Sequence, residues 1–325
     1  MKNFQTIVLL YIIFYSFISN AFFEDKNIFT DGDSKNKSFF NYFSDEKIQE
    51  DVIWNEATKL FDEKKFKKAG IKFETYYKNF PNNLNSYLAV LMHGHSLMEQ
   101  EKFEEAFSAY QLCIDNYSNN IKDFDIIMEL QYKAATSFMN KKRMTLISGG
   151  YKSPELAIPL FEKIINNNPE WSKSSELLFL IGETHQEMEN YEEAILVYKK
   201  IIYQYSNSLF YEKAFWQHIE CLNLLLKKYP NSSEMQDRLL NVSTIYLNNI
   251  KVSDNRAKIV KIRNNLYEVK AKKIFDQGEF YKNIMNNDKA AILSFKSMID
   301  NYPKSELVSN ALIQIEYLEK KKIKE

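Results

Sequence analysis

Four histidines, two cysteines and several adjacent glutamates are the residues on which catalysis or metal binding would depend in this sequence. His93 and His95 form a His-x-His pair, but positions i and i+2 of a helix point to different faces, so the two cannot share a metal within one helix. The patterns HExxH, CxxC, GxSxG and GxxxxGK[ST] are all absent. The sequence therefore predicts no enzyme, no metal site and no cofactor.

The paired glutamates have a structural explanation. Glu104-Glu105 and Glu192-Glu193 each precede an apolar-periodic segment, where carboxylates suit the positive N-terminal end of a helix dipole. An exported enzyme or hydrolase regulator stays open as an alternative, and it would need two close carboxylates and a histidine that converge from different segments.

Composition favours a helical chain. Its 325 residues carry 43 basic and 43 acidic side chains, and this balance argues against a nucleic-acid binder. Aromatic residues make up 15%, enough for an ample core, while seven glycines and six prolines disfavour β-sandwiches and glycine-rich phosphate loops.

The first residues have the layout of a secretory signal. Lys2 precedes an apolar run of 12 residues, Ile7–Ile18, and Ser19 and Ala21 supply small residues for a cleavage site. We therefore expect residues 1–21 to be a signal peptide, with an uncleaved anchor as the alternative. The two cysteines, Cys113 and Cys221, are predicted to be buried. Since no cysteine lies near the end of the apolar run, lipid attachment there is not expected, and any membrane association is expected to be indirect.

A repeat of about 37 residues organises the rest of the chain. Alanine is followed four residues later by an aromatic residue, and about twelve residues after the alanine by Pro or Ser. Ala69 and Ala106 are 37 residues apart, as are Ala157 and Ala194, and Ala291 continues the pattern. Small residues upstream mark where a partner helix crosses: Ala57, Gly94, Ala135 and Gly182.

These segments resemble tetratricopeptide repeats, most clearly from Leu178–His185 into Tyr191–Tyr198. The resemblance implies an all-α, superhelical array of about five helix–turn–helix repeats with a concave binding surface. We expect a flexible tether over residues 22–50, N-terminal repeats over 51–206 with an insertion near 140–154, and long helices with a last repeat over 207–320.

The C-terminal block carries a more specific likeness. Its residues are Arg263, Tyr267-Glu268, Ala271–Phe275, Gly278–Tyr281, Asp288–Ile292, Phe295, Ile299–Pro303 and Ala311-Leu312. This block resembles the C-terminal repeat of BamD-type outer-membrane β-barrel assembly factors. The resemblance implies a non-enzymatic scaffold at the periplasmic face of the bacterial outer membrane, whose partners are a barrel insertase with periplasmic domains and unfolded β-barrel substrates. A periplasmic adaptor for envelope or cell-division machinery is the alternative.

A groove along the first helix of each repeat suits such a role. Buried aromatic rings each contribute on the order of 1.5–3 kcal/mol before entropic costs. The outward positions are predicted to include Trp54, Thr58, Leu91, His95, Tyr132, Thr136, Phe179 and Glu183. The alternative is that these side chains pack between neighbouring repeats.

Overall fold

The computed structural model describes residues 49–142 and 152–324 of the chain, and these residues are helical throughout apart from their turns. The predicted signal peptide, nearly all of the predicted tether and most of the predicted insertion lie outside the described residues. The chain divides into two compact units, residues 1–89 and 90–325, with the division inside one helix. Within the described residues, no helix is both long and apolar enough to cross a bilayer.

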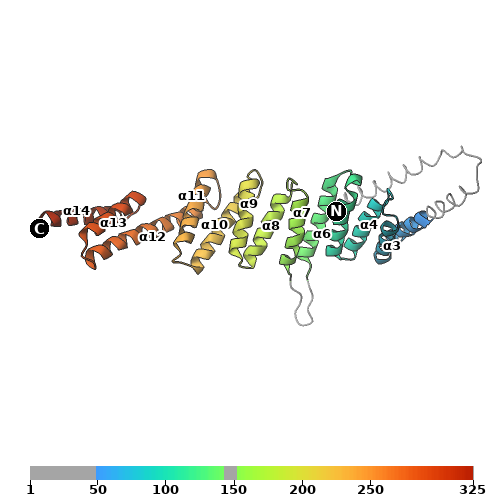
Figure 1. Cartoon of the computed structure of the whole chain (residues 1–325), viewed down its shortest axis with the longest axis horizontal. Helices are drawn as coiled ribbons and strands as arrows, with labels where there is room; N and C mark the ends of the chain where they lie inside the picture. Colours follow the sequence, from blue (N-terminus) through green and yellow to red (C-terminus); the bar gives the residue numbers. More distant parts are fainter. Residues whose placement is uncertain (1–48, 143–151, 325) are drawn as a thin grey trace, which may run out of the picture. The chain divides into compact units, whose positions relative to one another are not determined.

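Most of the helices follow one another with short turns, whereas residues 141–157 separate the helix that ends at Asn140 from the one that begins at Ile158 (Figure 1). The first helix runs over residues 49–62. The others are α3 Phe66–Asn79, α4 Ser86–Glu99, α5 Phe103–Tyr117, α6 Phe124–Asn140, α7 Ile158–Asn167, α8 Ser174–Glu187, α9 Tyr191–Gln204, α10 Tyr211–Lys228, α11 Ser233–Asn249, α12 Arg256–Asn283, α13 Asp288–Asn301 and α14 Val308–Lys324, with the 3₁₀ turns η1 Ser118–Asn120 and η2 Pro154–Ala157.

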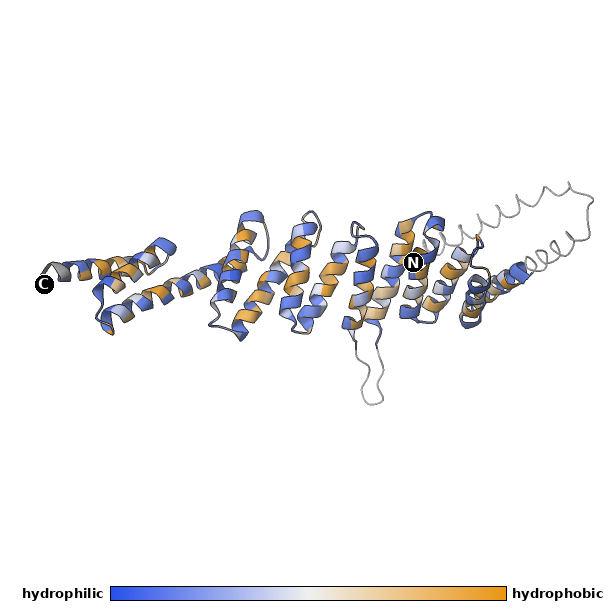
Figure 2. Ribbon diagram, in the orientation of Figure 1, coloured by the Kyte–Doolittle hydropathy of each residue, from blue (hydrophilic) through white to orange (hydrophobic). Residues whose placement is uncertain are grey.

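From α5 onward, each helix packs against the next one along the chain. The apolar residues lie along the helices and polar residues dominate the turns between them (Figure 2). This is the pattern expected when consecutive amphipathic helices bury their apolar stripes against each other. The predicted all-α repeat array is confirmed for the described residues.

An aromatic ring inserted beside a small residue joins the two helices of a repeat. A Cβ atom added to Gly94 would lie 2.5 Å from Cε1 of Tyr110, and one added to Gly182 would lie 2.5 Å from Cε1 of Tyr198. The predicted crossing points at Gly94 and Gly182 are therefore correct. Gly278 stands in the same relation to Phe295, which the sequence did not predict.

The turn inside the repeat has a recurrent backbone conformation. Lys64, Glu101, Glu189 and Asn286 adopt φ values of 58°, 56°, 60° and 47°. Each residue lies five positions before the small alanine of its repeat. A left-handed residue at this point lets the chain reverse direction within three or four residues, so the second helix begins close to the first.

Candidate interaction surfaces

Trp54 and Thr58, the first two predicted groove residues, are half-buried in the N-terminal unit. The indole of Trp54 lies 5.8 Å from the ring of Phe73 and 5.3 Å from that of Tyr76, centroid to centroid. The hydroxyl of Thr58 donates a hydrogen bond of 3.1 Å to the carbonyl oxygen of Trp54. Trp54 therefore contributes to the packing of its own repeat while part of its ring stays accessible.

Leu91 and His95 lie on α4 and are also half-buried. Nδ1 of His95 lies 3.2 Å from the hydroxyl oxygen of Tyr110, whose ring the imidazole meets edge-on. Burial, reinforced by the charge of Lys133, lowers the pKa of His95 to about 4. The imidazole is consequently neutral at pH 7.

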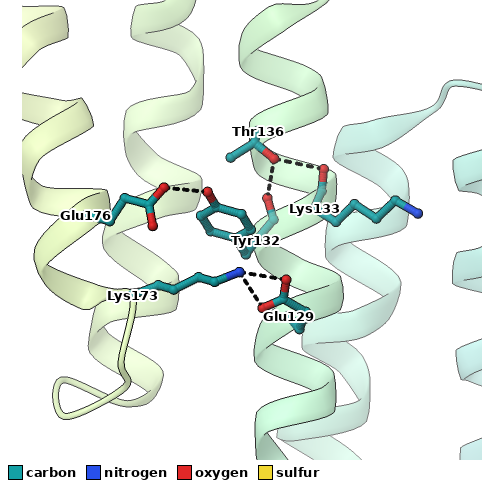
Figure 3. A network of polar contacts seen from close by, with 6 residues as sticks. All are labelled: Glu129, Tyr132, Lys133, Thr136, Lys173 and Glu176. Atoms are coloured by element: carbon teal, nitrogen blue, oxygen red, sulfur yellow. Dashed lines mark hydrogen bonds and ion pairs between the residues drawn. The ribbon is translucent and has the colours of Figure 1, made fainter. Parts of the chain in front are cut away.

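Tyr132 on α6 lies at the centre of a polar network with α8 and the turn before it (Figure 3). Its hydroxyl donates to Oε1 of Glu176 at 2.7 Å. The ammonium of Lys173 lies 4.1 Å above the centre of the Tyr132 ring and 2.7 Å from both carboxylate oxygens of Glu129. Thr136, one turn further along α6, bonds the carbonyl oxygen of Tyr132. These contacts tie α6 to the following repeat.

Phe179 is buried, with 8% of its surface exposed. Its ring packs between those of Tyr198 and Phe210, at centroid distances of 5.7 Å and 5.2 Å. The side chain belongs to the apolar core shared by two repeats, so a ligand would not reach it without opening that core. We therefore leave Phe179 out of the candidate surface.

Glu183 lies at an open depression between α8 and α10. The depression is lined by Glu183, Gln186, Glu187, Tyr191, Gln217 and Leu224. Sequence reasoning singled out Glu183 but missed the other five. Glu187 could have been found, because it lies one helical turn after Glu183 on the same face.

The two glutamine side chains that line the depression, Gln186 and Gln217, are held in place by hydrogen bonds. Oε1 of Gln186 accepts from the hydroxyl of Tyr198 at 3.1 Å and from the thiol of Cys221 at 3.4 Å. Nε2 of Gln186 donates to Oε1 of Gln217 at 3.2 Å. Because these bonds join α8, α9 and α10, the glutamine side chains of the lining are preorganised.

A second set of exposed residues, all apolar, lies in the C-terminal repeat. The sequence analysis did not predict it. Leu312, Ile313 and Tyr317 on α14 are exposed, as are Ile284 and Met285 after α12 and Leu293 on α13. The buried residues of α14, Ala311, Ile315 and Leu318, alternate with these and pack into the core of the repeat.

Both cysteines are buried free thiols, as predicted. Within residues 49–142 and 152–324, no group of three or more His, Cys, Asp or Glu side chains is placed to hold a metal ion.

Two segments of the chain, residues 176–208 and 274–305, match the family model of the tetratricopeptide repeat. The first contains α8 and α9, and the second contains α13 and the preceding part of α12. No curated protein matches the chain.

Solved structures give distant likenesses. A tetratricopeptide repeat protein from Parabacteroides merdae is 15% identical, over 82% of this chain and 98% of that one, with a TM-score of 0.31. The C-terminal part of a repeat-containing protein from Cytophaga hutchinsonii is 14% identical, over 85% and 92%, with a TM-score of 0.32. The MamA protein is 16% identical, over 69% and 94%, with a TM-score of 0.30.

Because these TM-scores are low, the assignment of tetratricopeptide-like repeats rests on the two matched segments and on the packing of their helices. Both matched segments contain a small residue that receives an aromatic ring, Gly182 with Tyr198 and Gly278 with Phe295. Such repeats are a framework for contacts between proteins. The chain therefore carries tetratricopeptide-like repeats within an all-helical array, a fold that implies protein partners.

Proposed function

We propose that this protein is an exported, non-enzymatic scaffold of outer-membrane β-barrel assembly. It would act at the periplasmic face of the bacterial outer membrane, where it would bind a barrel insertase through that protein's periplasmic domains and receive unfolded barrel substrates. The secretory layout of the first 21 residues supports export. The likeness of the block from Arg263 to Leu312 to BamD-type factors supports the partner class.

The observation that carries this proposal is the set of apolar side chains that the last repeat leaves exposed. Ile313 and Tyr317 are each 60% exposed and lie one turn apart on the outer face of α14. Apolar side chains that are exposed together on one helix face are typical of an interaction surface.

The substrate side of the proposal uses the first helices of the N-terminal repeats. Within the second unit, Tyr132 on α6 is half-buried, so part of this aromatic side chain lies at the surface. Unfolded barrel segments are rich in aromatic and alternating apolar residues, and contact with fixed rings suits them because it costs little side-chain entropy.

Affinity capture from detergent-solubilised envelopes, followed by mass spectrometry, tests the proposal. We expect the tagged chain to recover a large β-barrel protein with repeated periplasmic domains. Recovery of peptidoglycan or division proteins without such a barrel would instead identify an envelope or division adaptor.

Variants of α14 sharpen this test. The double substitution Ile313→Glu/Tyr317→Glu should abolish recovery of the barrel protein, because two charges would have to be desolvated in the contact. Ser206→Glu/Asn207→Glu adds the same charge at exposed positions in the turn between α9 and α10, away from this face, and serves as the control. Equal recovery with both variants would exclude this face as the contact.

A further inference from the structure

The depression between α8 and α10 contains two carboxylates without a cationic partner. Glu183 and Glu187 lie one turn apart on α8, and neither forms an ion pair within 4.0 Å with another described residue. Carboxylates at neighbouring repeat junctions are paired: Glu129 with Lys173 and Glu192 with Arg238, at 2.7 Å and 2.8 Å. Glu183 and Glu187 therefore lack the cationic partner that these two junction carboxylates have.

Holding these carboxylates together has a cost to the folded protein. Burial, and then the charge of Glu187, raise the pKa of Glu183, and the attraction of Lys213 offsets this only in part. Lys213 itself is exposed and lies with its ammonium 5.4 Å from the centre of the Phe210 ring. Charges kept in an unfavourable position within a hollow are characteristic of binding sites.

The rest of the lining suits a long cationic side chain. Leu224 offers an apolar wall for the methylene groups of such a side chain, and Tyr191 supplies an aromatic ring. The side-chain oxygen of Gln217 accepts a hydrogen bond from the amide of Gln186. A cation would thus find two carboxylates and two hydrogen-bonded amide side chains in one depression.

We propose that this depression receives an arginine or lysine side chain from a protein partner. The proposal rests on the proposed function only in that the partner is a protein. The methylene stem would lie against Leu224, and the charged group would be bound by Glu183 and Glu187. Through this contact, the array would recognise a basic residue at one position of the partner, while the neighbouring residues of the partner could vary.

Fluorescent hexapeptide pools with one fixed central residue test this inference. The fixed residue is arginine, lysine, or citrulline, which keeps the shape of arginine but lacks its charge. By fluorescence anisotropy, we expect the arginine pool to bind the wild-type chain at least about tenfold more tightly than the citrulline pool, the gain of about one charged hydrogen bond. Equal binding of the two pools would overturn the inference.

The double variant Glu183→Gln/Glu187→Gln should lose this preference for arginine. The control Glu189→Gln/Glu193→Gln removes the same charge from exposed residues outside the depression and should retain it. A preference that survives in the first variant, or disappears equally in both, would show that general charge attraction is responsible.

Thermal unfolding gives a readout that a purely structural role would move in the opposite direction. Because Glu183→Gln/Glu187→Gln removes repulsion between unpaired carboxylates, its melting temperature should rise by about 1–3 °C. A clear fall would mean that the glutamates stabilise the fold and would overturn the inference. Failure of envelope capture with an intact arginine preference would count against the outer-membrane role alone.

Discussion

At the scale of single residues, the turn inside each repeat uses a conformation that its residues do not favour. Glu189 adopts a φ of 60° between α8 and α9, and its side chain forms no hydrogen bond or ion pair with another described residue that would compensate for this conformation. For residues other than glycine, the left-handed region costs roughly 1–2 kcal/mol. The stability of the array is therefore below what the same backbone could support.

Glu189→Gly should stabilise the protein. The substitution relieves the strain of the left-handed conformation, but it also loosens the unfolded chain, which offsets roughly 0.4–1 kcal/mol. We expect a net gain of about 0.5–1 kcal/mol in urea-induced unfolding. Glu193→Gly, inside α9, is the control and should destabilise the protein by a similar amount. Loss of stability in both variants would contradict a strained turn at Glu189.

The buried His218 predicts a loss of stability in acid. It is 5% exposed on α10, its Nδ1 has no hydrogen-bond partner among the described residues, and burial together with Lys199 and Arg238 lowers its pKa to about 4. Glu192 opposes this shift only weakly. Between pH 6.5, where the unfolded histidine begins to bind a proton, and about pH 4, the unfolded state binds more protons than the folded state, so stability falls as pH falls.

His218→Gln should flatten this part of the pH profile. Each unit of pKa shift corresponds to about 1.4 kcal/mol, so the variant should lose roughly 2 kcal/mol less than the wild type between pH 7 and pH 4.5. Chemical denaturation at several pH values measures the difference. Parallel profiles for the two proteins would exclude His218 as a source of the acid sensitivity.

At the scale of helices, the interlock between a small residue and an aromatic ring was largely predictable from spacing. Sixteen residues separate Gly94 from Tyr110 and Gly182 from Tyr198, whereas seventeen separate Gly278 from Phe295. The last pair was missed because the turn before α13 is one residue longer and because Gly278 lies within the 28-residue helix α12. The spacing rule holds only while the turn keeps a constant length.

Gly182→Ala tests the interlock. Alanine normally stabilises a helix by about 1 kcal/mol relative to glycine. Here its Cβ would lie 2.5 Å from the Tyr198 ring, so we expect overpacking to destabilise the protein by about 1–3 kcal/mol. In the double variant Gly182→Ala/Tyr198→Leu, the loss should be smaller than the sum of the two single losses. Additive losses in unfolding experiments would mean that the ring does not occupy this space.

The candidate site was harder to predict than the fold, because it is assembled from residues of different repeats. Gln217 and Leu224 reach the depression from α10, more than thirty residues after Glu183, and no local pattern in α10 indicates which of its faces is hollow. Phe179 shows the converse. Its place in the helix suggested an exposed ring, but Phe210 in the next turn covers it. Contacts between repeats depend on how the helices stack, which spacing within one repeat does not encode.

The link between α6 and α8 can be measured through Lys173. Glu129 and Lys173 are both partly exposed, at 46% and 32% of their side chains, so solvent screens their attraction. A double-mutant cycle with Glu129→Ala and Lys173→Ala should give a coupling of about 0.5–1 kcal/mol at low ionic strength. The coupling should shrink in 1 M salt. A value near zero at both salt concentrations would leave the contact without a role in stability.

At the scale of the whole C-terminal part, α12 joins two separate apolar cores. Ile259 and Leu266 belong to a core built from α8 to α11 and the first part of α12, whereas Ala271 belongs to a core shared with α13 and α14. Val269, between them, is 54% exposed. The backbone of α12 therefore connects the two cores, together with the contacts that Tyr267 and Glu268 make with the turn before α14.

Val269→Pro should separate the unfolding of these cores. Proline removes a helical hydrogen bond and clashes with the preceding turn, at a cost of about 3 kcal/mol or more. We expect calorimetry to show a distinct transition of the C-terminal repeat at lower temperature, while Val269→Ala keeps the wild-type profile. A Val269→Pro profile of unchanged shape would mean that other contacts couple the two cores.

This long helix also constrains how the sequence can change in length. Each residue of an α-helix advances the chain by 1.5 Å and turns it by about 100°. A single insertion between Leu266 and Ala271 would therefore rotate the outer face of α14, with Ile313 and Tyr317, by more than a quarter turn about the axis of α12. An insertion of seven residues would nearly restore the phase. The number of residues in this part of α12 therefore sets the angle at which the exposed face of α14 is held relative to the preceding core.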